Sequence, residues 1–252
     1  MSGLLLRLAG PLQSWGERSV FTHRDTTAFP TRSALTGMFA AAEGRDRTQD
    51  PAYYADLRFT VRVDRPGLPL TDYHTVGGGL PPRETLITSE GKHKGAAVVS
   101  HRQYLADAVF TVAVTGPDAS VMRIAEALEH PIWAPFLGRR ACVPDEPLLL
   151  AAGLTDPEQE LLTSVPLSPD EARRATGDTV HVTFLWDRTP PHRPETATAL
   201  DVADQPLSFH PHNRRYGLRR LYRTEEPLPA TLTAPRGELR SRLLDYCLGA
   251  LA

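Results

Sequence analysis

Two histidines, a lysine and a tyrosine lie close together in the sequence, at Lys92, His93, His101 and Tyr104. A histidine can act as a general base near neutral pH, and a lysine can stabilise developing negative charge. Metal-independent cleavage of RNA needs these two functions next to the 2′-hydroxyl group. The stretch therefore contains suitable residue types for a ribonuclease. The alternative is a solvated loop, because glycines flank the segment around His93.

Aromatic and basic residues nearer the N-terminus are suited to holding single-stranded RNA. Bases are bound by stacking on aromatic rings, and phosphates by arginine, lysine and backbone N–H groups. Trp15 could stack on a base, or it could fill the core beneath its loop. Arg32 and Ser33 precede a helical pattern, where they could bind a phosphate or form an ordinary capped terminus.

Three further segments are basic. Residues 92–94 hold both lysines among the 28 basic residues of the chain. Arg139 and Arg140 follow Gly138, and five arginines lie between residues 214 and 223. Each segment could contact RNA, and the last could also contact protein. Each could instead be a solvated surface, since the excess of arginine over lysine is also typical of codon usage in a GC-rich genome.

Composition narrows the class of protein. A chain of 252 residues, 41% hydrophobic and 23% charged, can form one large domain or two small ones that share a core. The formal charge of −2 argues against coating nucleic acid by bulk electrostatics but permits a local basic track. The sequence contains no apolar run of ~20 residues and no signal-peptide pattern, which favours a cytoplasmic protein. Cys142 and Cys247 form no metal-ligand pattern, and Walker motifs and nucleophile elbows are absent, so no metal or cofactor is expected.

The positions of these residues depend on the elements around them. The apolar run Leu4–Ala9 predicts a buried strand, and a long loop then leads to a helix that begins at Thr31 or Ser33 and ends near Gly44. The free N–H groups at that helix start, beside Arg32, predict a phosphate site. Further strands are expected at 57–63, 108–114 and 148–150, with a helix capped by Asp118 between the last two.

This order is strand, helix, strand, strand, helix, strand, which is the ferredoxin-like order of RNA-recognition modules. Residues 71–107 contain several glycines and prolines and predict a protruding finger, in which 86–88 could pair with 97–99. Beyond residue 152 we expect a surface connection over 164–174, a strand at 180–186 and a helix over 238–248.

Several short blocks among these residues together resemble the CasD family. The blocks occur in the same order as in that family, and the similarity is thinner beyond the last of them. They are Leu6–Gly16, Phe29–Ser33, Arg65–Gly67, Asp72–Val76, Arg102–Phe110 and Leu137–Cys142.

The resemblance implies a fold and a function. CasD proteins are subunits of the type I-E CRISPR surveillance complex, Cascade, and hold the 5′ handle of the guide RNA (crRNA). The resemblance implies an α+β fold of the RAMP superfamily: a ferredoxin-like domain over 1–150, a β-hairpin thumb at about 71–107, and a smaller β-rich part over 151–252 packed on it. It also implies contact with a CasC-type backbone subunit and a CasA-type large subunit, with target DNA met only indirectly. Some relatives in other subtypes cleave precursor crRNA without metal, whereas the I-E branch leaves cleavage to its CasE subunit.

We therefore predict a non-catalytic RNA-binding subunit, with a metal-independent endoribonuclease as the alternative. In the RAMP superfamily the segment around Arg139 is a glycine-rich loop that faces RNA, and only Gly138 represents it in this chain. The residues predicted to contact RNA are Gln13, Ser14, Trp15, Arg24, Arg32, Ser33, His74, Lys92, His93, Lys94, His101, Arg102, Arg139, Arg140, Arg214 and Arg215.

Overall fold

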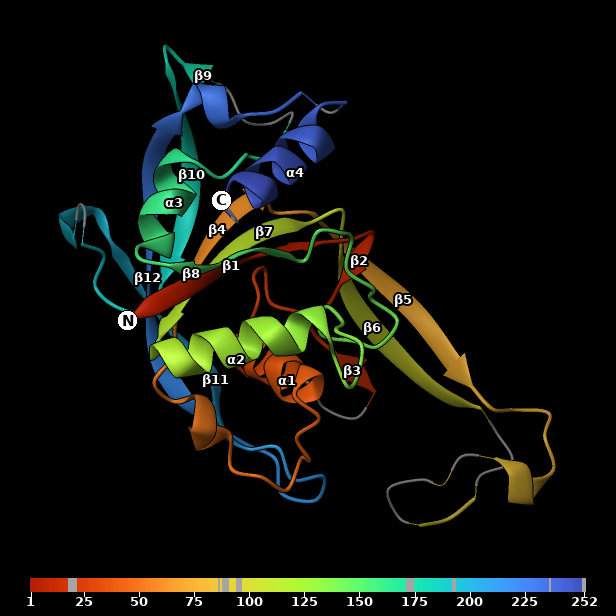
Figure 1. Cartoon of the computed structure of the whole chain (residues 1–252). Helices are drawn as coiled ribbons and strands as arrows, with labels where there is room; N and C mark the ends of the chain where they lie inside the picture. The colour runs from red at the N-terminus through yellow and green to blue at the C-terminus, as the bar shows by residue number, and fades with distance from the viewer. Residues whose placement is uncertain are drawn as a thin grey trace.

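The computed structural model describes residues 1–17, 22–85, 87, 91–93, 97–170, 175–191, 194–235 and 237–250. Its main feature is a sheet in which every neighbouring pair of strands is antiparallel, with helices on both faces (Figure 1). A smaller sheet projects from one side as a two-stranded arm.

The first half of the main sheet has the ferredoxin-like arrangement. In chain order its elements are β1 (Ser2–Ala9), α1 (Arg32–Ala42), β4 (Arg58–Arg65), β7 (Val109–Gly116), α2 (Asp118–Glu129) and β8 (Leu149–Leu154). The strands lie in the order β4-β7-β1-β8. The strand–helix–strand–strand–helix–strand order predicted from the sequence is confirmed.

The central strand β1 explains why both faces are covered. Leu4, Leu6 and Leu8 pack in the core with α1 and α2, whereas Leu5 packs in a second core with α3 (Pro157–Thr163) and α4 (Leu239–Gly249). Successive side chains of a strand point to opposite faces, so an unbroken apolar run requires a cover on each side. Figure 1 shows the two pairs of helices on opposite sides of the sheet.

The C-terminal part continues this sheet. β10 (Thr179–Trp186) pairs with β4, and β12 (Arg215–Pro229) and β11 (Thr198–Ser208) follow it outward. The short β9 (Ala175–Thr176) pairs with β10. The expected smaller C-terminal part therefore shares a sheet with the N-terminal domain.

The expected surface connection over 164–174 is wrong in its first half, because Val165 and Leu167 are fully buried. The guanidinium group of Arg62, itself 0% exposed, donates to the carbonyls of Leu161, Val165 and Pro166 at 2.7–3.0 Å. Together with the isolated bridge between Leu167 and Thr233, these hydrogen bonds satisfy the backbone of the segment, so it can lie in the interior. Residues 171–174 lie outside the described part of the chain.

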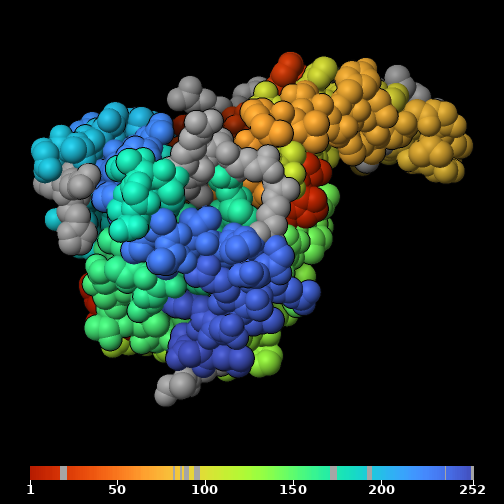
Figure 2. Space-filling view, turned by 90° about the horizontal axis from the view of Figure 1, so that it is seen from above, coloured from red at the N-terminus to blue at the C-terminus, as the bar shows by residue number. Residues whose placement is uncertain are grey.

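The smaller sheet forms the thumb, which we define as β5 (Leu68–Val76), β6 (Val98–Ala106) and their connection. β5 and β6 pair antiparallel along their full length, and β2 (Leu12–Gln13) and β3 (His23–Arg24) pair with the other edge of β6. Figure 2 shows β5 extending away from the body of the molecule.

The expectation that regular structure stops at Thr71 is wrong, since each strand of the arm has nine residues. Both faces of β5 are at least partly exposed, so its sequence does not alternate between apolar and polar residues. The predicted pairing of 86–88 with 97–99 is not observed. Ile87 instead pairs with His93 in an isolated bridge, and Leu86 and Thr88 lie outside the described residues.

Candidate nucleic-acid interface

The loop after β2 and the loop around Gly138 are held together by backbone contacts. The N–H of Ser14 donates to the carbonyl of Leu137 at 3.1 Å. Gly138 has φ +83°, and a Cβ atom at this position would lie 1.7 Å from the carbonyl oxygen of Ser14. Only glycine fits this contact, because a side chain would meet backbone that cannot move aside without breaking the pair of loops. The contact fixes the position of the residue that follows, Arg139.

Arg139 lies where the thumb meets the body. Its Nη2 donates to the carbonyl of Arg24 at 3.0 Å, and its guanidinium carbon lies 4.5 Å from the ring centroid of Tyr104. Its Nη1 is buried and has no hydrogen-bond partner within the described part of the chain. A buried donor without an acceptor is costly, so an acceptor that reached this atom would stabilise the site.

Five of the predicted residues line one open hollow, which we call the arginine hollow: Ser14, Arg24, Ser33, Arg139 and Arg214. Its volume is about 640 Å³. The three arginines come from β3, from the loop after α2 and from the connection between β11 and β12, so residues far apart in the sequence converge here. Guanidinium groups converging on a hollow are suited to binding the phosphates of a single strand.

Acidic residues also border the arginine hollow, at Glu17 and Asp25. An oxygen of the Glu17 carboxylate accepts a hydrogen bond from the N–H of Ala203 at 2.9 Å, which ties it to β11. The side chains of Arg24 and Arg214 are exposed. Three arginines therefore face two carboxylates in the lining, so the excess of positive charge in the hollow is small.

Gln13 and Trp15 are buried, which corrects the prediction that they contact RNA. Both are 0% exposed. The Gln13 amide donates to the carbonyls of Leu8 and Ala108 at 3.0 and 2.8 Å and accepts from the Trp15 indole N–H at 3.1 Å. Of the two alternatives for Trp15, the structure favours core filling. Both side chains stabilise the root of the thumb and do not present a surface to a ligand.

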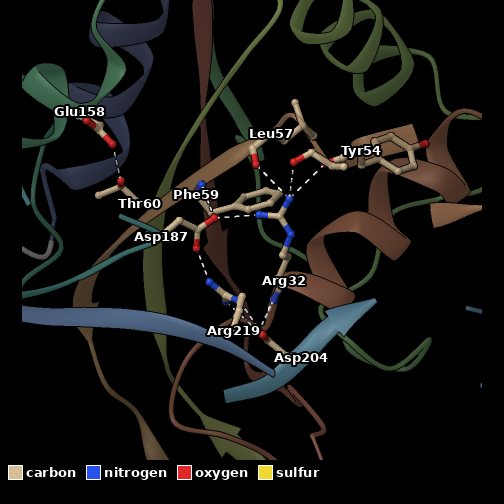
Figure 3. Close-up of polar contacts among 10 residues, drawn as sticks. Arg32, Tyr54, Leu57, Phe59, Thr60, Glu158, Asp187, Asp204 and Arg219 are labelled. Atoms are coloured by element: carbon tan, nitrogen blue, oxygen red, sulfur yellow. Dashed lines mark hydrogen bonds and ion pairs between the residues drawn. The ribbon is translucent and has the colours of Figure 1, made fainter. Parts of the chain in front are cut away.

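Arg32 is also a structural residue, with a side chain that is 5% exposed (Figure 3). Its guanidinium group donates to Asp187 at 2.9 Å and to the backbone carbonyls of Tyr54, Ala55 and Leu57 at 3.0–3.2 Å. Every face of the group is occupied by the protein, so the predicted phosphate contact of Arg32 is not supported.

The N-terminus of α1 already holds an anion. The N–H of Arg32 donates to the Asp204 carboxylate at 2.7 Å, and the same carboxylate accepts two bonds from Arg219 at 2.5 and 2.8 Å. Arg219 also pairs with Asp187 (Figure 3). The free N–H that was expected to bind phosphate is therefore used by the chain itself, which corrects that prediction.

Burial shapes the pKa values in this network. Burial lowers the pKa of Arg32 below its ordinary value, although Asp187 opposes the shift. Burial raises the pKa of Asp187, against the attraction of Arg219 and Arg32. Burial by itself would lower the pKa of Arg219, but its bonds to Asp204 and Asp187 leave this pKa raised. The negative charges of two carboxylates thus balance the positive charges of two guanidinium groups in the interior.

The remaining predicted residues are distributed along the thumb and at its base. His74 pairs with Asp72 at 3.3 Å, and Arg102 donates to the Ser100 hydroxyl at 3.2 Å. Arg140 and Arg215 are exposed. Lys92 and His93 lie beyond the end of β5, where the His93 ring is 2.9 Å from the carbonyl of Thr85. Lys94 lies outside the described residues.

The residue types that suggested cleavage are not brought together. His93 lies beyond the paired strands, whereas His101 and Tyr104 belong to β6. His101 and Tyr104 are three residues apart on one strand, so their side chains point to opposite faces. Tyr104 is 7% exposed and packs at the root of the thumb, as predicted.

Comparison with known proteins accounts for this arrangement of sheet and thumb. Residues 3–222 match the model of the family described as CRISPR-associated protein (Cas_Cas5). The chain belongs to this CRISPR-associated family. A relative, the CRISPR system Cascade subunit CasD of Escherichia coli (strain K12), is 36% identical over 184 residues, covering 67% of this chain and 80% of the relative.

Solved structures of the CRISPR-associated family share the fold. A chain of a CRISPR RNA-guided surveillance complex superimposes with a TM-score of 0.87 and 46% identity, covering 98% of this chain and all of the other. A crystal structure of a Cas protein superimposes with a TM-score of 0.55 and 30% identity, covering 92% of this chain and 97% of the other. The match over nearly the full length includes the C-terminal strands, which lie beyond the last of the sequence blocks.

None of the described helices is long and apolar enough to cross a membrane. Likewise, the described residues contain no cluster of three histidine, cysteine or acidic side chains that could hold a metal ion.

Proposed function

We propose that this protein is a non-catalytic subunit of a Cascade-type surveillance complex, and that it holds the 5′ handle of the crRNA in the arginine hollow. The observation that carries the proposal is the convergence of Arg24, Arg139 and Arg214 on one hollow at the base of the thumb. The buried Nη1 of Arg139, which lacks an acceptor within the described part of the chain, adds a donor suited to a phosphate oxygen.

The relatives support this assignment. The E. coli relative is named as a Cascade subunit, and the structure with the higher TM-score belongs to an RNA-guided surveillance complex. In such an assembly the protein would meet a CasC-type backbone subunit and a CasA-type large subunit, and target DNA only through them. The chain would work in the cytoplasm without a cofactor.

Metal-independent cleavage of precursor crRNA is the second candidate. His93, His101 and Tyr104 are the residue types that favour it. Against it, these side chains come from different places along the thumb, and catalysis needs its groups in a fixed common geometry. We therefore favour binding over cleavage.

A gel-shift experiment with labelled repeat-derived RNA tests the proposal. The purified protein is expected to retard the RNA, and denaturing gels of the same samples are expected to show it intact after hours, with or without a divalent ion. Shortened RNA that depends on His93 or His101 would establish the nuclease instead. RNA that stays free at all protein concentrations, also when the backbone subunit is added, would contradict both candidates.

A further inference from the structure

Three aromatic side chains lie side by side across three strands of the thumb sheet, and we call them the ring row: Tyr73 on β5, His101 on β6 and His23 on β3. In the register of the sheet, His101 is the direct partner of both other residues. The ring centroids of Tyr73 and His101 are 5.3 Å apart, and those of His101 and His23 are 5.4 Å apart. The imidazoles of His23 and His101 are nearly parallel, at 15°, whereas the Tyr73 ring meets His101 edge-on, at 68°. The sheet therefore presents three adjacent rings in a line.

The ring row is exposed. Tyr73 is 63% exposed, and both histidines are exposed as well. Aromatic rings on a strand usually pack into a core, because each buries a large apolar area. Three neighbouring rings left in solvent on a regular sheet mark a surface that is suited to a planar ligand.

The neighbours of the ring row on β5 and β6 are uncharged. The strand residues beside it on the same side are Thr71 and Thr75 of β5 and Val99 and Gln103 of β6. Asp72 belongs to the opposite face, where it pairs with His74. These strand neighbours add no negative charge that would repel an RNA strand.

The opposite face of the same sheet carries guanidinium groups. Arg24 and Arg102 directly follow His23 and His101 and are partners in the register, so they share the other face. β3 is an edge strand in the order β2-β6-β3. An RNA strand that crosses this edge can meet arginines on one side and rings on the other.

We propose that the ring row is a stacking site for an unpaired base of single-stranded RNA, with Tyr73, His101 and His23 as the contact residues. The inference rests on the proposed function and deepens it by separating base contacts from phosphate contacts. Aromatic rings on adjacent strands bind splayed bases in RNA-recognition sheets by the same chemistry. Two of the residues, Tyr73 and His23, are not among those that the sequence indicated.

The test compares two double variants of the full chain. Tyr73→Ala with His101→Ala removes the rings, whereas Tyr73→Phe with His101→Phe keeps flat surfaces and removes the polar atoms. The probe is single-stranded repeat-derived RNA with 2-aminopurine at one position at a time, and its affinity is measured at several salt concentrations. Thr71→Ala with Thr75→Ala, on the same face of β5, is the matched control.

The alanine pair is expected to bind about 5- to 150-fold more weakly, since a stacked base contributes roughly 1–3 kcal/mol. The phenylalanine pair and the control should bind as the wild type does. At least one 2-aminopurine should be quenched by the wild type and by the phenylalanine pair, but not by the alanine pair. The salt slope should stay unchanged, because stacking releases no counterions.

Other results would overturn the inference. If the alanine pair binds normally while Arg24→Ala with Arg139→Ala does not, the ring row is not a base site and the proposed function stands. A phenylalanine pair as weak as the alanine pair would assign the contact to polar atoms. If the alanine pair binds RNA normally but fails to join a backbone subunit, the surface is a protein interface. A wild-type protein that does not bind the probe would contradict the proposed function as well.

Discussion

Replacing Gly138 with alanine is expected to separate the loop pair at the base of the thumb. The new Cβ atom would lie 1.7 Å from the Ser14 carbonyl oxygen, far inside van der Waals contact, so the two loops must move apart. The movement breaks the hydrogen bond from the Ser14 N–H to the Leu137 carbonyl. It also displaces Arg139, the residue that follows, so both stability and RNA affinity should fall.

The expected loss of stability in Gly138→Ala has two causes. A left-handed backbone costs an alanine about 1–2 kcal/mol, and the lost hydrogen bond costs about 0.5–1.5 kcal/mol more. We therefore expect the free energy of unfolding to fall by about 1.5–3.5 kcal/mol. For a chain of this size, that corresponds to a decrease in Tm of about 3–14 °C.

Gly177→Ala is the matched control, because Gly177 also has a positive φ, +63°, but a Cβ atom there would meet nothing within 4 Å. Gly177→Ala should lose only the stability that a left-handed backbone costs an alanine, and it should bind RNA normally. Urea denaturation and RNA titration of both variants give the comparison. Equal losses of stability in the two variants, with RNA affinity unchanged in Gly138→Ala, would refute the role assigned to the loop contact.

Three further predictions concern buried side chains. Trp15→Ala should lower the free energy of unfolding by roughly 3–5 kcal/mol, because the ring is fully buried. Normal melting with weakened RNA binding would instead show that the Trp15 ring stacks on a base. Asp187→Ala should cost about 3–5 kcal/mol, because it removes the carboxylate that pairs with the buried Arg32 guanidinium group. Asp201→Ala, in a surface pair whose aspartate is 61% exposed, should cost under about 1 kcal/mol. Similar melting curves for the two variants would disprove the structural role of Asp187. Burial alone would raise the pKa of Glu43, but hydrogen bonds, first among them that from Arg45, lower it. Because the pKa is lowered in the folded state, the Glu43 carboxylate stabilises the fold above its unfolded pKa of about 4.3, and this stabilisation is lost as the pH falls through the folded pKa. The stability advantage of the wild type over Glu43→Gln should therefore shrink on acidification. An advantage independent of pH would contradict this.

The core of the fold could be predicted from the sequence because its strands are buried. The run at Leu4–Ala9 and the helical spacing of α1 and α2 reflect contacts with a covered sheet, and such patterns are local. β5 lacks such a pattern because its side chains are at least partly exposed. Its register comes from backbone pairing with β6, which residue types do not reveal.

The candidate site could be predicted only in part for a related reason. Residue types identified the arginines that reach the arginine hollow, but not that Arg32 is enclosed by partners up to 172 positions away in the sequence. The ring row depends on strand register, which brings together His23 and Tyr73 from separate strands. Its only signal in the sequence was the aromatic type of each residue.

The salt dependence of RNA affinity tests the central claim most directly. The triple variant Arg24→Ala, Arg139→Ala and Arg214→Ala removes the cations of the arginine hollow. Each lost phosphate contact should lower the slope of log K against log salt by about 0.7 on single-stranded RNA, so three contacts predict a decrease of about 2. Alanine at Arg47, Arg223 and Arg240, which are exposed and lie outside the hollow, should leave the slope unchanged. A well-folded triple variant of the hollow with the wild-type slope would contradict the account.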